Sequence, residues 1–167
     1  MNKKLYVMIG IPGSGKSTYA KTYLIDRNTR YVSRDEIRFS LVKEDEDYFS
    51  KEDEVFETFL DTIRVGLASD LNIIADATHL NPSSRMKLLA SLYEDLKDVD
   101  VIGVFMRTPV KTCIARNEMR KETRSYVPPY VINSMAKKLK QPTFNECNGI
   151  FSKIIIIDED KMIKLTE

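Results

Sequence analysis

The sequence predicts an α/β protein in which a central parallel sheet of five strands carries helices on both faces. Two observations lead to this fold class. Short apolar runs alternate with longer segments of helical periodicity, and proline next to a capping residue marks several helix starts. No repeat, linker or low-complexity stretch interrupts the alternation. At 167 residues the chain can bury a real core, so we expect one domain over residues 1–167.

Each element follows from a local pattern. Apolar, β-favouring runs predict strands at Leu5–Ile9, Arg30–Ser33, Asn72–Ala75, Val99–Met106 and Lys153–Ile157. Helical spacing predicts helices at Lys16–Arg27, Glu52–Leu67, Pro82–Leu96, Pro109–Arg120 and Pro128–Lys140. The pairs Asn81-Pro82 and Thr108-Pro109 each place a capping residue before a proline at the first helical position, and Pro128-Pro129 is a weaker case. Ligands of such sheets bind beyond the carboxyl ends of the strands, so the residues after each strand are the functional candidates.

The stretch "GIPGSGKST", residues 10–18, lies between the first strand and the first helix. It satisfies the pattern G-x-x-x-x-G-K-[ST], whose glycines let backbone N–H groups surround an anion. Lys16 can reach the β- and γ-phosphates, and Ser17 can ligate Mg²⁺. A plain glycine turn is the alternative, but every required residue is present, so we expect ATP with Mg²⁺. The residues expected to bind ATP are Gly10, Pro12, Gly13, Ser14, Gly15, Lys16, Ser17 and Thr18.

The stretch "SRDEIR" follows the second strand and contains Asp35 and Arg38. An acid beside the reacting phosphate can accept the proton of an attacking hydroxyl, and an arginine one helical turn further can hold the acceptor. The alternative is a capping aspartate with a local ion pair to Arg38. Because a phosphate-binding loop precedes this turn, we favour Asp35 as general base and Arg38 as an acceptor-binding residue.

The stretch "ADATHLNPSSR" follows the third strand. Asp76 ends that strand beside the predicted phosphate loop, where a carboxylate can orient a magnesium-bound water. Ser17 is therefore the expected metal ligand, with Asp35 or Asp76 acting through water. Asp76 and Thr78 are also candidates for acceptor binding. We expect Asn81 to cap a helix, and His79 to be a polar residue at the surface or behind the site.

An arginine-rich stretch, "RTPVKTCIARNEMRKETRSYVPP", follows the fourth strand. Arg116, Arg120 and Arg124 are spaced by four, so they share one helical face as far as the helix persists. No acid stands three or four residues from any of them. As a lid over the phosphate loop, at about residues 109–127, this segment would supply positive charge to a transferring phosphoryl group. A solvent-exposed basic helix is the alternative.

In this order the motifs resemble the 5′-kinase domain of phage-type polynucleotide kinases, within the P-loop kinases and their AAA-type ATP-binding relatives. The match runs from Gly10 to about Lys140, and its closest pieces are "GIPGSGKST", "RDEIR", "THLNPSSR", "ARNEMR" and "VPPYVINSM". The resemblance implies that Asp35 is the general base and that Arg38 contacts the polynucleotide end. It further implies that Lys16 and Ser17 handle triphosphate and metal, that Arg120 stabilises the transferring phosphate, and that Arg116 is a second lid arginine.

Charge and composition restrict the remaining possibilities. Net charge is +1, with acids concentrated at residues 44–61 and bases at residues 107–140, which suggests a cleft with a preferred side for phosphates. Cys113 and Cys147 are widely spaced and there is one histidine, so we expect reduced thiols and no zinc site. No apolar run reaches the length of a membrane span and no signal peptide is visible, so we expect a cytoplasmic protein. No obligatory protein partner can be inferred.

Three functions are consistent with these features. The first is an ATP-dependent kinase acting on the 5′-hydroxyl end of RNA or DNA, with contact to one or two nucleotides because no aromatic-rich strand face is present. The second is a kinase for a small-molecule acceptor, such as a nucleotide-sugar, nucleoside or sugar. The third is an ATP-binding switch that acts through partners. The first is favoured by the resemblance.

Overall fold

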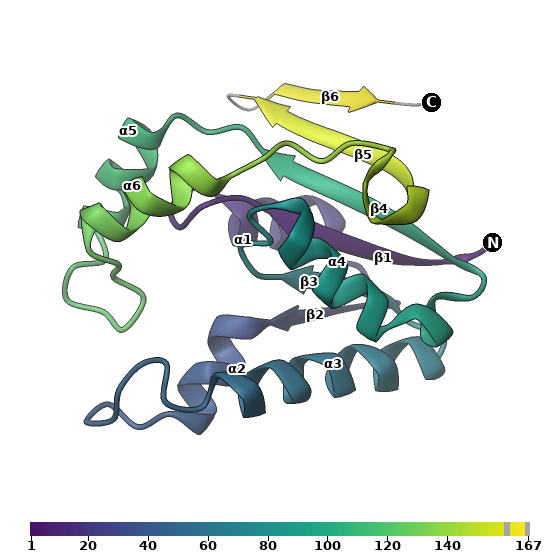
Figure 1. Ribbon diagram of the computed structural model, residues 1–167, viewed down its shortest axis with the longest axis horizontal. Coiled ribbons are helices and arrows are strands. Elements are labelled where there is room, and N and C mark those ends of the chain that lie inside the picture. The colour runs from purple at the N-terminus through teal and green to yellow at the C-terminus, as the bar shows by residue number, and fades with distance from the viewer. Residues whose placement is uncertain (159–160, 166–167) are drawn as a thin grey trace.

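The computed structural model describes residues 1–158 and 161–165, and the rest of the expected domain, residues 159–160 and 166–167, lies outside this description (Figure 1). The described residues form a six-stranded sheet in the order β2-β3-β1-β4-β5-β6. Its strands are β1 Lys3–Ile9, β2 Thr29–Ser33, β3 Asn72–Asp76, β4 Val99–Met106, β5 Phe151–Asp158 and β6 Lys161–Leu165. The five expected strands pair in parallel, which confirms the predicted fold class. The sequence did not indicate β6, which pairs antiparallel with β5 at the sheet edge.

The helices largely follow the expected segments. They are α1 Lys16–Tyr19, α2 Arg34–Leu41, α3 Glu52–Ala68, α4 Pro82–Ser91, α5 Val110–Glu118 and α6 Pro129–Lys138. A π-helical turn, η1 Ala20–Leu24, continues α1, and 3₁₀ turns lie at η2 Tyr93–Leu96 and η3 Glu146–Gly149. The predicted helix Lys16–Arg27 is therefore too long, because the backbone becomes extended at Ile25. None of the helices in the described ranges combines the length and apolarity needed to cross a bilayer.

Two of the three proline-marked helix starts behave as expected. The Asn81 side chain accepts a hydrogen bond from the Ser84 amide in a capping box, and Pro129 occupies the first turn of α6. The third expectation was wrong, because Thr108 does not cap α5. Its hydroxyl instead donates to the Ser14 carbonyl oxygen at 2.8 Å. The residue before Pro109 thus fastens the start of α5 to the phosphate loop.

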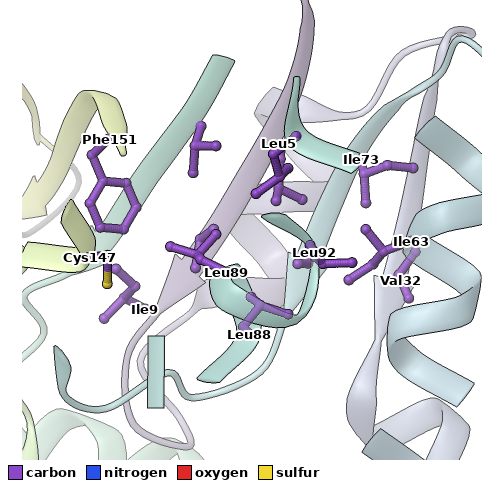
Figure 2. Packing of buried hydrophobic residues seen from close by; sticks show 14 of the residues in the cluster. Leu5, Ile9, Val32, Ile63, Ile73, Leu88, Leu89, Leu92, Cys147 and Phe151 are labelled. Carbon is purple, nitrogen blue, oxygen red and sulfur yellow. The ribbon is translucent and has the colours of Figure 1, made fainter. Parts of the chain in front are cut away.

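The main core lies between the sheet and the helices α3 and α4 (Figure 2). It contains Leu5 and Ile73 from the strands, Ile63 from α3 and Leu88 from α4. A smaller cluster on the opposite face packs Met8 and Ile74 against Ala20. Burial of both faces leaves the carboxyl ends of the parallel strands as the open edge, where the loops after β1, β2 and β3 meet.

A third cluster joins the lid to the phosphate loop. It packs Ile11 of the loop against Cys113 of α5 and Ile132 of α6. Both cysteines of the chain, Cys113 and Cys147, are buried and carry free thiols.

Candidate active site

The phosphate loop, residues 10–18, leaves the end of β1 at the centre of the sheet. The Gly10 amide donates to the Thr78 carbonyl oxygen at 3.0 Å, which ties the loop to the turn after β3. Gly13 has a φ of 82°, and a Cβ atom there would lie 2.4 Å from the carbonyl oxygen of Cys113 in α5. Only glycine fits this conformation and this close approach. The packing of α5 against the phosphate loop therefore leaves no room for a side chain at Gly13.

A cleft of about 750 Å³ lies above this loop. Of the residues expected to bind ATP, Pro12, Gly13, Gly15, Lys16, Ser17 and Thr18 line it. Ser14 is buried beneath the loop surface, and Gly10 is buried at the start of the loop. One wall of the cleft is α2 with the segment at residues 42–51. The other wall is the lid loop, residues 119–127, with α6. Figure 1 shows both walls projecting on the same side of the molecule.

Lys16 lies in the loop with carboxylates around it. Its Nζ donates to the Ile11 carbonyl oxygen at 3.2 Å. Burial lowers the pKa of Lys16 from its ordinary value, and the charges of Asp76 and Asp35 oppose that shift. The two acids predicted from separate strand ends thus both lie close enough to influence the phosphate-loop lysine.

Ser17 and Asp76 form the expected metal-side pair. Asp76 Oδ2 accepts a hydrogen bond from Ser17 Oγ at 2.6 Å and another from the Tyr31 hydroxyl. Burial, together with the charge of Asp76, raises the pKa of Tyr31, so this hydroxyl stays a donor. A hydroxyl and a carboxylate beside a phosphate loop fit Mg²⁺, which prefers oxygen ligands. The buried position of Asp76 favours this metal-side role over contact with an acceptor.

Asp35 and Arg38 lie in the first turn and the middle of α2, which Ser33 caps through its side chain. Arg38 Nη1 donates to Asp35 Oδ1 at 2.5 Å. The Tyr48 hydroxyl donates to the same Asp35 oxygen at 3.2 Å. Asp35 Oδ2 has no hydrogen-bond partner among the described residues, and the Asp35 side chain is 65% exposed. One carboxylate oxygen is therefore held in place, the other is free of hydrogen bonds to the described residues, and Asp35 lines the cleft.

Glu52 completes this network from the first turn of α3. It accepts from Arg38 Nε at 2.6 Å and from Arg38 Nη2 at 3.1 Å. Burial alone would raise the pKa of Glu52, but the hydrogen bonds and charges of Arg38 and Arg34 outweigh it and lower that pKa. Burial and the charge of Asp35 raise the pKa of Tyr48 to about 12, so its hydroxyl remains protonated at neutral pH. Arg38 is thus buried with its donors engaged, and in this arrangement it orients Asp35.

The three lid arginines do not share one helical face, because α5 ends at Glu118. Arg116 Nη1 makes a long contact of 3.4 Å to the Gly13 carbonyl oxygen. Arg120 lines the cleft, and its guanidinium makes no hydrogen bond or ion pair with the described residues. Arg124 points elsewhere: it donates to the carbonyl oxygens of Phe39 and Val42 at 3.1 and 2.6 Å. Arg116 and Arg120 thus remain beside the phosphate loop, whereas Arg124 fastens the lid loop to α2.

A single side chain closes the base of the lid loop. The fully buried Asn117 donates from Nδ2 to the Val127 carbonyl oxygen at 2.6 Å and accepts from the Val127 amide at 3.0 Å. Because the chain must bring Val127 back to Asn117, it leaves the helical path after Glu118, the last residue of α5. The expected lid, residues 109–127, is therefore a helix followed by a closed loop.

The turn after β3 mainly helps to position the parts of the site around it. Thr78 lines the cleft. His79 is buried, not at the surface, and its Nδ1 lies 2.7 Å from the Met8 carbonyl oxygen. Burial lowers the pKa of His79 to about 4, so the ring is neutral at physiological pH. His79 supports the strand that leads into the phosphate loop.

Sequence reasoning missed Tyr31, Tyr48, Phe49 and Glu52, all of which line the cleft. The last three lie in the acidic stretch at residues 44–61, whose charge alone suggested a cleft, without indicating a particular residue. Tyr48 and Phe49 could have been found from the sequence, because two adjacent aromatic side chains within an acidic segment are seldom left simply exposed to solvent. Nothing local pointed to Glu52 as the partner of Arg38.

Comparison with known proteins places this site in context. The L-seryl-tRNA(Sec) kinase of Methanococcus maripaludis is 23% identical over 184 residues, which covers 98% of this chain and 69% of that kinase. A chain of the Pnkp1/Rnl/Hen1 RNA repair complex superposes with a TM-score of 0.71 at 24% identity, over 83% of this chain. A gluconokinase from Sinorhizobium meliloti 1021 superposes with a TM-score of 0.57 at 16% identity, over 95% of this chain and 83% of the kinase.

These likenesses show a shared fold. The chain spans only 44% of the RNA-repair chain that it matches. The matched proteins include kinases named for a tRNA-linked acceptor and for a sugar acid, so they do not single out one acceptor. The sequence model of AAA_33, an AAA domain, matches residues 5–142, which is most of the chain. The protein therefore belongs to the AAA_33 family and has the fold of the P-loop kinases.

Proposed function

We propose that the protein transfers the γ-phosphate of ATP to a hydroxyl acceptor, and that this acceptor is the 5′-hydroxyl end of RNA or DNA. The observation that carries the proposal is the Asp35 carboxylate, which lines the same cleft as the phosphate loop, with Oδ1 held by Arg38 and Tyr48 and Oδ2 free of hydrogen bonds to the described residues. A mere capping aspartate would not need this second support from Tyr48. An ATP-binding switch that transfers no phosphate would not require a carboxylate held in this way.

The reaction follows from the positions of the chain's own groups. Lys16 and the loop amides hold the triphosphate at the end of β1. The hydroxyl oxygen of the acceptor attacks the γ-phosphorus, its proton passes to Asp35 Oδ2, and the bond to the β-phosphate oxygen breaks to release ADP. Bound Mg²⁺, held through Ser17 and Asp76, would neutralise charge on the β- and γ-phosphate oxygens.

The lid supplies the remaining charge. Arg120 faces the cleft without a partner among the described residues, so its guanidinium is available to the transferring phosphoryl group. Arg116 lies at the rim of the loop, next to Gly13 and Gly15. These two arginines, rather than Arg124, are the candidates for transition-state stabilisation.

A polynucleotide acceptor is favoured over a small molecule by the shape and charge of the cleft. Its volume of about 750 Å³ opens between α2 and the lid loop, and Arg120 is the basic residue of the stretch at residues 107–140 that lines it. A phosphate-bearing acceptor can therefore follow the lid while its terminal hydroxyl points to Asp35. The likeness to a chain of an RNA repair complex supports this choice, and the likeness to gluconokinase supports the small-molecule alternative.

Transfer of label from [γ-³²P]ATP tests the proposal. We expect label on 5′-hydroxyl RNA or DNA oligonucleotides, none on the same oligonucleotides carrying a 5′-phosphate, and little on panels of nucleosides, sugars and nucleotide-sugars. Asp35→Asn keeps size but removes basicity, so it should lower transfer by about 10²- to 10⁴-fold while ATP binding stays near that of the wild type. Label on a sugar alone would establish the small-molecule kinase, and wild-type transfer by Asp35→Asn would remove this mechanism.

A further inference from the structure

An exposed aromatic pair stands in the acceptor half of the cleft. Tyr48 and Phe49 lie in the segment between α2 and α3, and their ring centroids are 4.8 Å apart with the planes at 86°. Phe39 of α2 lies behind Tyr48 at 6.4 Å. Phe49 is 61% exposed although it lines the cleft. Edge-to-face packing fixes the two rings relative to each other but leaves ring surface free for a ligand.

Tyr48, the first residue of this pair, is hydrogen-bonded to the proposed base, Asp35. The Tyr48 hydroxyl lies 3.2 Å from Asp35 Oδ1. The Arg38 guanidinium carbon lies 4.7 Å from the centroid of the Tyr48 ring and so holds that ring by a cation–π contact. A group bonded close to a hydroxyl at Asp35 can therefore reach Tyr48 and Phe49. The rings are positioned to meet the first unit of the acceptor, not a distant part.

Charge indicates which part of the acceptor these rings meet. The same segment carries four consecutive acids directly before Tyr48, namely Glu44, Asp45, Glu46 and Asp47. These four acids do not line the cleft, and the two arginines of this wall, Arg34 and Arg38, are already paired with Glu52 and Asp35. On the opposite wall the Arg120 guanidinium has no partner among the described residues and can attract a phosphate. A neutral, flat group fits the aromatic wall, while phosphodiesters fit the lid wall.

We propose that the exposed ring of Phe49, held edge-to-face by Tyr48, is a stacking platform for the nucleobase of the acceptor's 5′-terminal nucleotide. This proposal rests on the proposed function and adds the part of the substrate that the cleft recognises. Stacking uses the π-face that every base has, so the platform selects for the presence of a base with little preference among the four. It also accounts for recognition of a single nucleotide, since the pair can hold one base.

The test compares two 5′-hydroxyl oligonucleotides that differ only in the terminal unit, which carries a base in one and is abasic in the other. Steady-state transfer is measured for the wild type, Phe49→Ala, Phe49→Trp and Tyr93→Ala. Tyr93 is 67% exposed and lies outside the cleft, so Tyr93→Ala is the matched control for loss of an exposed aromatic ring. Melting temperatures verify that each variant is folded.

Phe49→Ala should raise KM for the base-bearing acceptor about five- to hundredfold and leave KM for the abasic acceptor and for ATP unchanged. Phe49→Trp should restore the preference for a base, and Tyr93→Ala should match the wild type throughout. If Phe49→Ala changes KM equally for both acceptors, or for neither, the stacking proposal is wrong, and the proposed 5′-kinase activity is unaffected by that result. If the wild type labels neither oligonucleotide, the proposed function has failed, and the nucleobase assignment fails with it.

Discussion

Protonation of His79 should destabilise the fold between pH 6.5 and pH 4. Its Nδ1 lies 2.7 Å from the Met8 carbonyl oxygen, and because a carbonyl only accepts, Nδ1 carries the hydrogen of the neutral ring. A second proton must therefore go to Nε2 of a buried ring, next to the positive charges of Arg34 and Lys16. Burial, the largest cause, lowers the pKa of His79 from 6.5 to about 4.

The magnitude follows from linkage. Between the two pKa values the unfolded chain binds more protons than the folded chain, so the free energy of unfolding falls as pH falls. The contribution is complete above pH 6.5. A shift from 6.5 to about 4 amounts to a loss of about 2 kcal/mol by pH 5 and about 3 kcal/mol by pH 4.

Denaturant unfolding at pH 7, 5 and 4 measures this loss when the wild type is compared with His79→Asn. Residue 79 has a φ of 43°, a left-handed conformation that asparagine tolerates better than most residues, and its amide can still donate to a carbonyl. Carboxylates titrate in both proteins, so their effect cancels in the difference. The wild type should lose about 3 kcal/mol more than the variant by pH 4. Parallel stability curves would refute the assignment of a buried, neutral His79.

Three further variants probe the phosphate site and its supports. Lys16→Ala should abolish transfer and weaken ATP binding in calorimetry, and normal turnover by a folded variant would exclude this loop as the nucleotide site. Arg120→Ala should leave the melting temperature nearly unchanged and lower kcat about 10³-fold, because the Arg120 side chain has no partner among the described residues; strong destabilisation with activity retained would make it structural. Arg38→Ala should cost about 1.5–3 kcal/mol of stability, because Glu52 loses two charged hydrogen bonds and keeps only Arg34, and it should lower kcat because Asp35 is then held by Tyr48 alone. A variant that melts like the wild type and changes only KM for the acceptor would instead show direct acceptor contact by Arg38.

Sequence alone predicted the features whose requirements are local. The phosphate loop, residues 10–18, needs glycines, a lysine and a hydroxyl at fixed spacing, and the Asn81 cap needs only its own turn. The surroundings of the proposed base could not be predicted, because Arg38 meets Tyr48 and Glu52 through the packing of α2 against α3 and not through helical spacing. Arg124 was misplaced for the same kind of reason: the helix stops before it, and its partners are carbonyl oxygens of α2.

The pairing between Asn117 and Val127 determines which part of the lid can change while its helices stay in place. One buried side chain satisfies both backbone groups of Val127, so the nine residues between them form a ring that is closed at its base. A loop closed at its base can change in length without moving α5 or α6, because insertion in a surface loop costs little closure entropy. Arg120 lies inside this ring and lines the cleft, and Arg124 holds the loop to α2. Residues 118–126 can therefore vary around these two arginines while the helices that flank the loop stay in place.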